Sequence, residues 1–150
     1  MLPNFLVCGV QKATTTSLYA YLRQHPQIYL PETKELNYFN QHWGKPLTWY
    51  AAHFAAWSGQ PAVGEVSPLY LWDEHTPERI ARTLPEARLI FLLRNPIDPA
   101  YSIDWFNVAR GVQNPKESFS AAIRSPEGEW RYLSKGLYAA QLSRYVLHFP

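Results

Sequence analysis

Residues 5–22, FLVCGVQKATTTSLYAYL, join an apolar run to an amphipathic segment through a short polar hinge. The run Phe5–Val10 is continuous, as in a parallel strand that is buried on both faces. The segment Ser17–His25 has apolar residues at helical spacing and ends before a proline. Between them stand Lys12 and a series of hydroxyl side chains. The stretch therefore predicts a buried strand, a tight polar turn and a helix.

The rest of the chain continues the alternation of strands and helices. We expect strands in PAVGEVS (61–67), ending near Glu65, and in ARLIFLLR (87–94), ending at Arg94. Helices are expected over TPERIARTL (76–84, capped by Thr76), NPIDPAYSIDWFNVARG (95–111, capped by Asn95), PKESFSAAI (115–123) and LYAAQLSRYVLHF (137–149), with a short one over 48–54. This order predicts a three-layer, P-loop-like α/β fold, with a central parallel sheet flanked by helices and ligands outside the carboxyl ends of the strands.

Composition narrows the class of protein. A chain of 150 residues with 47% hydrophobic and 17% charged residues fits one globular domain. The net charge of +2 does not favour nucleic acid as a partner. Cys8 is the only cysteine, so a disulfide framework is excluded and a buried thiol is expected. No apolar run approaches the ~18 residues of a membrane span, and the start MLPNFLVCGV lacks a basic leader region, so we expect a cytoplasmic protein.

The polar hinge has the chemistry of an anion site. The first N–H groups of a helix have no intrahelical partner and, with the helix dipole, attract a phosphate or sulfate. Lys12 adds a cation and residues 14–17 add hydroxyl donors. The mononucleotide pattern G-x-x-x-x-G-K-[ST] is not met, because Thr14 and Thr15 stand where its second glycine and its lysine would be. A threonine-rich helix cap beside a surface lysine remains the alternative.

The order GVQKATTTSLYAYLRQHPQI resembles the 5′-phosphosulfate-binding loop of sulfotransferases. ARLIFLLRNPIDPAYS is similar to the family's 3′-phosphate motif, an arginine at a strand end with a serine eight residues later. GEVSPLYL, KELNYF and GLYAAQLSRYVLHFP resemble further blocks of the heparan-sulfate-type and related bacterial branch, which has a glutamate base. Together the blocks cover nearly the whole chain in the family's order.

The resemblance implies a donor, 3′-phosphoadenosine 5′-phosphosulfate (PAPS), and no metal. Its 5′-phosphosulfate would be held by the loop residues Lys12, Ala13, Thr14, Thr15, Thr16 and Ser17. Arg94 and Ser102 would bind the 3′-phosphate. Lys12 would also neutralise charge on the bridging oxygen as the sulfuryl group departs, and is therefore a catalytic candidate.

The resemblance makes Glu65 the candidate base, since the acceptor hydroxyl or amine must lose a proton as it attacks sulfur. A structural ion pair of Glu65 with Lys12 or Lys34 is the alternative. Lys34, Tyr38 and His42 are candidate acceptor contacts, although a solvated lysine and packed rings explain them equally well. The acceptor itself would be a small molecule or a carbohydrate.

Several positions depart from the family pattern. Thr14 replaces a glycine, Pro99 replaces an arginine and Val66 replaces a lysine. Family members also continue past the position of Pro150, so we expect 1–150 to be a sulfotransferase domain that is incomplete at its C-terminus. Apolar surface left open would then be covered, for example, in a homodimer. Two other readings stay open: a P-loop nucleotide or small-molecule kinase, and a truncated, non-catalytic domain that binds PAPS or its bisphosphate product.

Overall fold

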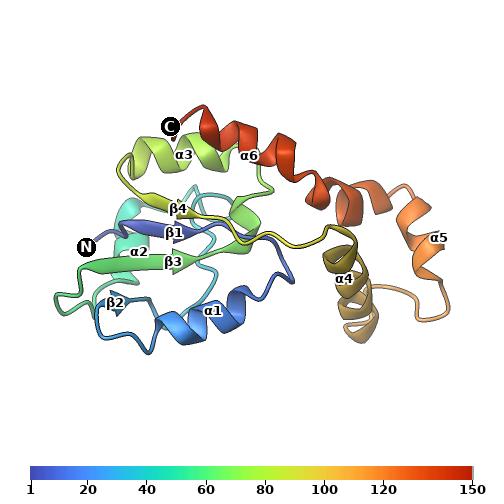
Figure 1. Ribbon diagram of the computed structural model, residues 1–150, viewed down its shortest axis with the longest axis horizontal. Helices are drawn as coiled ribbons and strands as arrows, with labels where there is room; N and C mark the ends of the chain where they lie inside the picture. Colours follow the sequence, from blue (N-terminus) through green and yellow to red (C-terminus); the bar gives the residue numbers. More distant parts are fainter. Residues whose placement is uncertain (150) are drawn as a thin grey trace.

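Four parallel strands form the centre of the molecule in a computed structural model, which describes residues 1–149 (Figure 1). The strands are β1 (Phe5–Val7), β2 (Ile28–Tyr29), β3 (Ala62–Val66) and β4 (Arg88–Ile90), in the order β2-β3-β1-β4. In the register of the sheet, Leu6 of β1 lies between Glu65 of β3 and Leu89 of β4. The predicted α/β fold with a central parallel sheet is confirmed.

The strands β1 and β4 stay together beyond their regular parts. The backbone N–H of Cys8 donates to the carbonyl of Ile90 (2.8 Å), and that of Val10 donates to Leu92 (3.0 Å). The predicted strand 5–10 therefore has an extended partner along its length. Strand β2 was not predicted, because two residues are too short to show an alternating pattern.

Helices follow the strands at the predicted places along the chain. They are α1 (Thr15–Leu22), α2 (Leu47–Ala52), α3 (Thr76–Thr83), α4 (Ile97–Ala109), α5 (Phe119–Arg124) and α6 (Tyr138–Val146), with the short turns η1 (Pro68–Tyr70), η2 (Glu129–Leu133) and η3 (Ser134–Gly136). Asn95 caps α4 as expected, since its Oδ1 accepts from the N–H of Ile97. Thr76 does not cap α3: it is the first helical residue, and Asp73 Oδ1 accepts from its N–H.

The two faces of the sheet belong to different layers. Phe5 and Val7 point to one face, where they cluster with Val66 and are covered by the apolar residues of α1. Leu6 and Cys8 point to the other face and pack in a larger cluster that includes Ile80 of α3, Tyr50 of α2 and Tyr145 of α6. This alternation follows from the period of two in a strand. The turn after β1 lies at the carboxyl end of the sheet, where neither layer of helices covers the strand ends.

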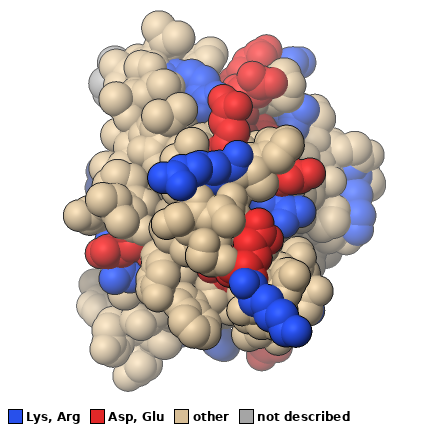
Figure 2. All heavy atoms as spheres, turned by 90° about the vertical axis from the view of Figure 1, so that its right-hand side faces the viewer, with Lys and Arg blue, Asp and Glu red and all other residues tan. Residues whose placement is uncertain are grey.

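A separate group of helices lies beyond that end of the sheet. Helices α4 and α5 with η2 form a helical lobe whose small core contains Ala100, Ile103, Ala122 and Tyr132. In Figure 1 the strand arrows point toward this lobe. Seen from the side of the lobe, basic and acidic side chains are interspersed without a large patch of one sign (Figure 2). Within residues 1–149, no helix has both the length and the apolar character needed to cross a membrane.

Candidate active site

The turn after β1 is pressed tightly between strand and helix. A Cβ added to Gly9 would come within 3.1 Å of both Leu92 Cβ and Thr15 Cγ2. The N–H of Ala13 donates back to the carbonyl of Val10 (3.2 Å) and closes the turn. A glycine at position 9 therefore allows the chain to enter α1 immediately beside β4.

The turn is also conformationally strained. Lys12 and Thr14 have φ of 63° and 58°, in the left-handed region that β-branched residues strongly avoid. Thr14 Oγ1 donates to the neighbouring carbonyl of Ala13 (2.7 Å) and makes no side-chain cap to the helix. The first N–H groups of α1 thus keep their capacity for an anion. The sequence-based expectation of strain at Thr14 is confirmed in its geometry.

A second strained loop follows β2. Glu35 and Asn37 have φ of 61° and 50°, and with Lys12 and Thr14 they are the non-glycine residues with positive φ in the described part of the chain. The N–H of Glu35 donates to the carbonyl of Val66 at the end of β3 (3.1 Å). Both strained loops therefore lie at the carboxyl edge of the sheet. Backbone strain of this kind concentrates at functional sites.

The two loops and the helical lobe enclose a cleft of about 510 Å³. One wall is the turn after β1, with Lys12, Thr14, Thr15 and Thr16. The opposite wall comes from α4, η2 and η3, with Ser102, Phe106, Trp130, Arg131 and Lys135. Glu35 also lines the cleft, from the loop after β2. The structure thus brings together five residues predicted for the donor: Lys12, Thr14, Thr15, Thr16 and Ser102. Of the other predicted loop residues, Ala13 is buried in the turn and Ser17 is exposed in the first turn of α1.

Three basic side chains line the cleft, Lys12 on one wall and Arg131 and Lys135 on the other. Lys12 Nζ lies 3.7 Å from the centroid of the Phe106 ring on the opposite wall, so it spans the opening. Lys135 Nζ donates to Gln11 Oε1 (3.2 Å), and burial, with the nearby Arg131, lowers the pKa of Lys135. A bound anion would relieve both effects on Lys135. Lys135 and Arg131 were missed from sequence, because η2 and η3 carry no periodic pattern that orients them.

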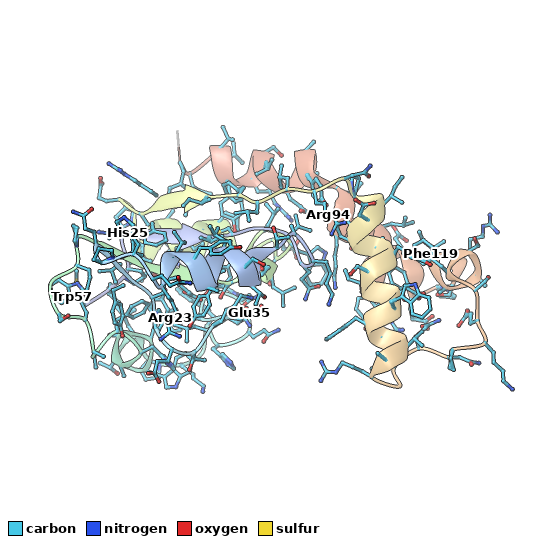
Figure 3. The ribbon with its side chains drawn as sticks, turned by 60° about the horizontal axis from the view of Figure 1, so that its bottom comes forward. Arg23, His25, Glu35, Trp57, Arg94 and Phe119 are labelled. Carbon is cyan, nitrogen blue, oxygen red and sulfur yellow. The ribbon has the colours of Figure 1, made fainter. Side chains whose placement is uncertain are left out.

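Arg94 lies beside the strained turn after β1. Its Nη1 donates to the carbonyl of Lys12 (3.1 Å) and its Nε donates to Asp98 Oδ2 (3.1 Å). The side chain is 45% exposed and is not part of the cleft wall. Figure 3 shows Arg94 where the chain enters α4. Arg94 therefore supports the strained turn, and its contact with a 3′-phosphate stays a prediction.

Glu65, the candidate base, has its carboxylate inside a set of hydroxyl donors. The side chain is 1% exposed and does not line the cleft. Its Oε1 accepts from the hydroxyls of Ser67 (2.5 Å) and Tyr70 (2.7 Å), and its Oε2 accepts from Tyr50 (2.5 Å). Burial raises the pKa of Glu65, and these hydroxyls oppose that rise. Lys34 pairs with Glu35 and not with Glu65, so the alternative of an ion pair does not apply to Lys34, and the role of Glu65 as base stays a prediction.

The carboxylate that does reach the cleft is Glu35 (Figure 3). Its side chain is 39% exposed and forms an ion pair with Lys34, whose side chain is 16% exposed. Sequence reasoning included Lys34 and passed over its neighbour, since the two-residue β2 that brings this loop to the sheet edge was invisible. The KELNYF block was the available signal.

The remaining candidates for acceptor contacts lie away from the cleft. Tyr38 is buried and stacks on Tyr50 with ring centroids 4.5 Å apart. His42 packs edge-on against Trp49 at 5.3 Å. Neither lines the cleft, and their contact with an acceptor stays a prediction. Among the described residues, no three His, Cys, Asp or Glu side chains come together as a group of metal ligands.

A parallel sheet with an anion-binding turn after its first central strand, a lysine in that turn and a serine on the facing helix define a P-loop-like transferase of anionic groups. A solved sulfotransferase from Alicyclobacillus acidocaldarius matches this structure with a TM-score of 0.90 and 32% sequence identity, over 99% of this chain and 70% of that one. The chain belongs to the sulfotransferase family.

Curated relatives agree with this assignment. The chain is 40% identical over 112 residues to the membrane-associated sulfotransferase kil1 of Dictyostelium discoideum, a match that covers 69% of this chain and 24% of the relative. It is 35% identical to the human bifunctional heparan sulfate N-deacetylase/N-sulfotransferase 3, over 99% of this chain and 19% of that protein. The chain thus spans about a fifth to a quarter of the length of these relatives. No family model matches it.

Proposed function

We propose that this protein transfers a sulfuryl group from PAPS to a hydroxyl or amine of a small-molecule or carbohydrate acceptor. The observation that supports this most directly is the cleft itself. It combines an anion-binding turn, the Lys12 cation, a facing serine and a partly exposed carboxylate within one cavity. These are the groups that sulfuryl transfer from an anionic donor requires.

The donor would lie across the cleft from the turn to the helical lobe. Its 5′-phosphosulfate would accept from the N–H groups at the start of α1 and from the hydroxyls of Thr15 and Thr16. Its 3′-phosphate would accept from Ser102, with Arg94 close behind the turn. Lys135 and Arg131 add positive charge on the same wall. They stand in for the cation that Pro99 does not supply.

Glu65 is the base in this proposal, as the family resemblance implies. The acceptor oxygen or nitrogen attacks sulfur while its proton passes to the Glu65 carboxylate, whose pKa is raised by burial. The bond between sulfur and the bridging oxygen then breaks, and the electron pair leaves with adenosine 3′,5′-bisphosphate. Lys12 Nζ turns from the Phe106 ring toward that oxygen and neutralises its growing charge. Glu35, paired with Lys34, lines the same cleft.

Calorimetric titration with adenosine 3′,5′-bisphosphate in EDTA tests the donor site. We expect binding that needs no divalent metal, and we expect Lys12→Ala to weaken it. Lys45→Ala is the matched control, because Lys45 also lies over an aromatic ring, Trp49 at 4.1 Å, but outside the cleft. Binding of ATP with Mg²⁺ in preference to the bisphosphate would favour the kinase reading. Bisphosphate binding without turnover on any acceptor would favour a non-catalytic domain.

A further inference from the structure

A second, much smaller cavity lies at the junction of the sheet, the helical lobe and α6. Its volume is about 20 Å³, and its lining comes from the turn after β1, η1, the start of α4 and the segment from η2 to α6. Gln11 and Lys135 line both this cavity and the cleft, and the Lys135 Nζ hydrogen bond to Gln11 Oε1 (3.2 Å) joins them. The proposed transfer of the sulfuryl group does not use this junction cavity.

Two polar side chains of α6 line the junction cavity with atoms that lack a partner. Tyr138 and Gln141 are three residues apart, so they share one face of the helix. Gln141 is 3% exposed, and its Nε2 donates to the carbonyl of Ser134 (2.7 Å). Its Oε1 and the Tyr138 hydroxyl are both buried, and neither has a hydrogen bond to any group within residues 1–149.

Such a pair of atoms needs an explanation, because folded proteins leave few buried polar groups unpaired. The orientation of the Gln141 amide is fixed, since its nitrogen is already used on Ser134 and its oxygen must face elsewhere. A water molecule needs about 10–15 Å³ of such space and at least two polar partners. The junction cavity meets both requirements, and its volume excludes anything much larger.

We propose that the junction cavity is a binding site for one ordered water molecule, which bridges Tyr138 and Gln141. The Tyr138 hydroxyl donates to the water oxygen, and the water donates to Gln141 Oε1. The direction follows from the chemistry of the two groups, because an amide oxygen can only accept. Burial raises the pKa of Tyr138, so its hydroxyl keeps the proton that it donates.

The bridged pair would hold α6 against the wall of the cleft. With Oε1 held by the water, Gln141 keeps its Nε2 on the carbonyl of Ser134, the residue before Lys135. Ser134 is also fixed from η1's side, since Trp72 Nε1 donates to its Oγ (3.1 Å). The water therefore completes a chain of hydrogen bonds from α6 through η3 to Gln11 in the turn after β1.

Tyr138→Phe tests the site, because the presence and the absence of a water predict opposite signs. With the water, the variant removes one of its two partners, and the equilibrium constant for folding should fall about three- to tenfold. Without it, the variant removes a buried hydroxyl that had no partner, and the constant should stay the same or rise. Tyr145→Phe on the same helix is the matched control, since its hydroxyl donates to the carbonyl of Tyr70 (2.7 Å) and its loss should lower the constant in either case.

A high-resolution crystal structure of the unsubstituted chain gives the direct answer, whether or not the variant folds. We expect one water at about 2.8 Å from both the Tyr138 hydroxyl and Gln141 Oε1. The same water should be present in Tyr145→Phe and lost in Tyr138→Phe. A dry cavity in the unsubstituted chain, or a Tyr138→Phe variant at least as stable as that chain, would overturn the proposal. Neither measurement depends on sulfuryl transfer, so the outcome is separate from that of the proposed function.

Discussion

Two glutamates at the carboxyl edge of the same sheet, Glu35 and Glu65, lie in opposite environments. Glu65 belongs to a regular strand, is completely buried and has both oxygens occupied by hydroxyl donors. Glu35 stands in a strained loop, is partly exposed and has a single lysine partner. The comparison sets a buried carboxylate held by hydroxyl donors against a partly exposed one paired with a lysine. The family resemblance assigns the proton transfer to the first, and substitution of each side chain tests which of the two takes the proton.

The partners of each carboxylate explain the difference. Tyrosine and serine hydroxyls stabilise Glu65 without a neighbouring cation, so its charge stays inside a fixed network. Glu35 instead forms an ion pair with Lys34. With Glu65 as the proposed base, we expect a large effect of substitution at Glu65 and a modest effect at Glu35.

The largest expected effect is that of Glu65→Gln. Proton abstraction by a positioned base contributes about 10²–10⁴ in rate, so kcat should fall by that factor while bisphosphate affinity hardly changes. Glu35→Gln should lower kcat by less than about tenfold, because Glu35 is given no proton transfer in the proposed reaction. Steady-state kinetics and calorimetry on both variants make the comparison. A severe loss in Glu35→Gln with a mild one in Glu65→Gln would reverse the assignment.

Lys12→Ala should produce the next largest loss. A positive charge beside the leaving oxygen contributes about 10²–10³ in kcat in comparable sites. The affinity for the bisphosphate should fall as well. Lys45→Ala, which removes a similar cation–aromatic contact elsewhere, should leave both values unchanged. If both lysine variants behaved alike, the loss would reflect general charge and not the site.

The sequence was sufficient for the parts of the site that follow regular elements. The strand 5–10, the turn and the first helix could be predicted because apolar periodicity and hydroxyl residues mark each boundary, and this placed Lys12 and the threonines correctly. The strand 61–67 was also correct, but its burial pattern does not tell which way Glu65 points. In the register of the sheet, Glu65 lies opposite Leu6 of β1. Leu6 belongs to the larger core cluster on one face of the sheet.

The missed residues share a physical cause. Glu35 reaches the cleft because β2 pairs with β3 over only two residues, Ile28 and Tyr29. Lys135 and Arg131 reach it because the helical lobe folds back over the turn through short, irregular helices. Long-range packing, which no local pattern encodes, decides both.

The pH dependence of stability tests the burial of Glu65. Its pKa is raised in the folded protein, so the folded state binds this proton more tightly than the unfolded state. Its contribution is therefore fully present below the unfolded pKa of about 4.3 and is lost as pH rises through the folded value. The slope for one proton cannot exceed about 1.4 kcal/mol per pH unit. Denaturant unfolding between pH 4 and 8 should show this loss in the original protein and not in Glu65→Gln; equal slopes would contradict the raised pKa.

The smallest effect is expected at Thr14, in the turn after β1. Thr14 has φ of 58°, and a left-handed conformation costs an ordinary residue about 1–2 kcal/mol. Glycine removes that cost but adds about 0.5–1 kcal/mol of chain entropy to the unfolded state, so Thr14→Gly should stabilise the protein by up to about 1 kcal/mol. Thr16→Gly is the control, since Thr16 lies in the first turn of α1 and glycine there should destabilise by about 1 kcal/mol. Because the Thr14 hydroxyl is already donated to the carbonyl of Ala13, bisphosphate affinity should stay the same or improve in Thr14→Gly. A clear loss of affinity in that variant alone would show that the hydroxyl turns to the donor, and that the strain at this position serves binding.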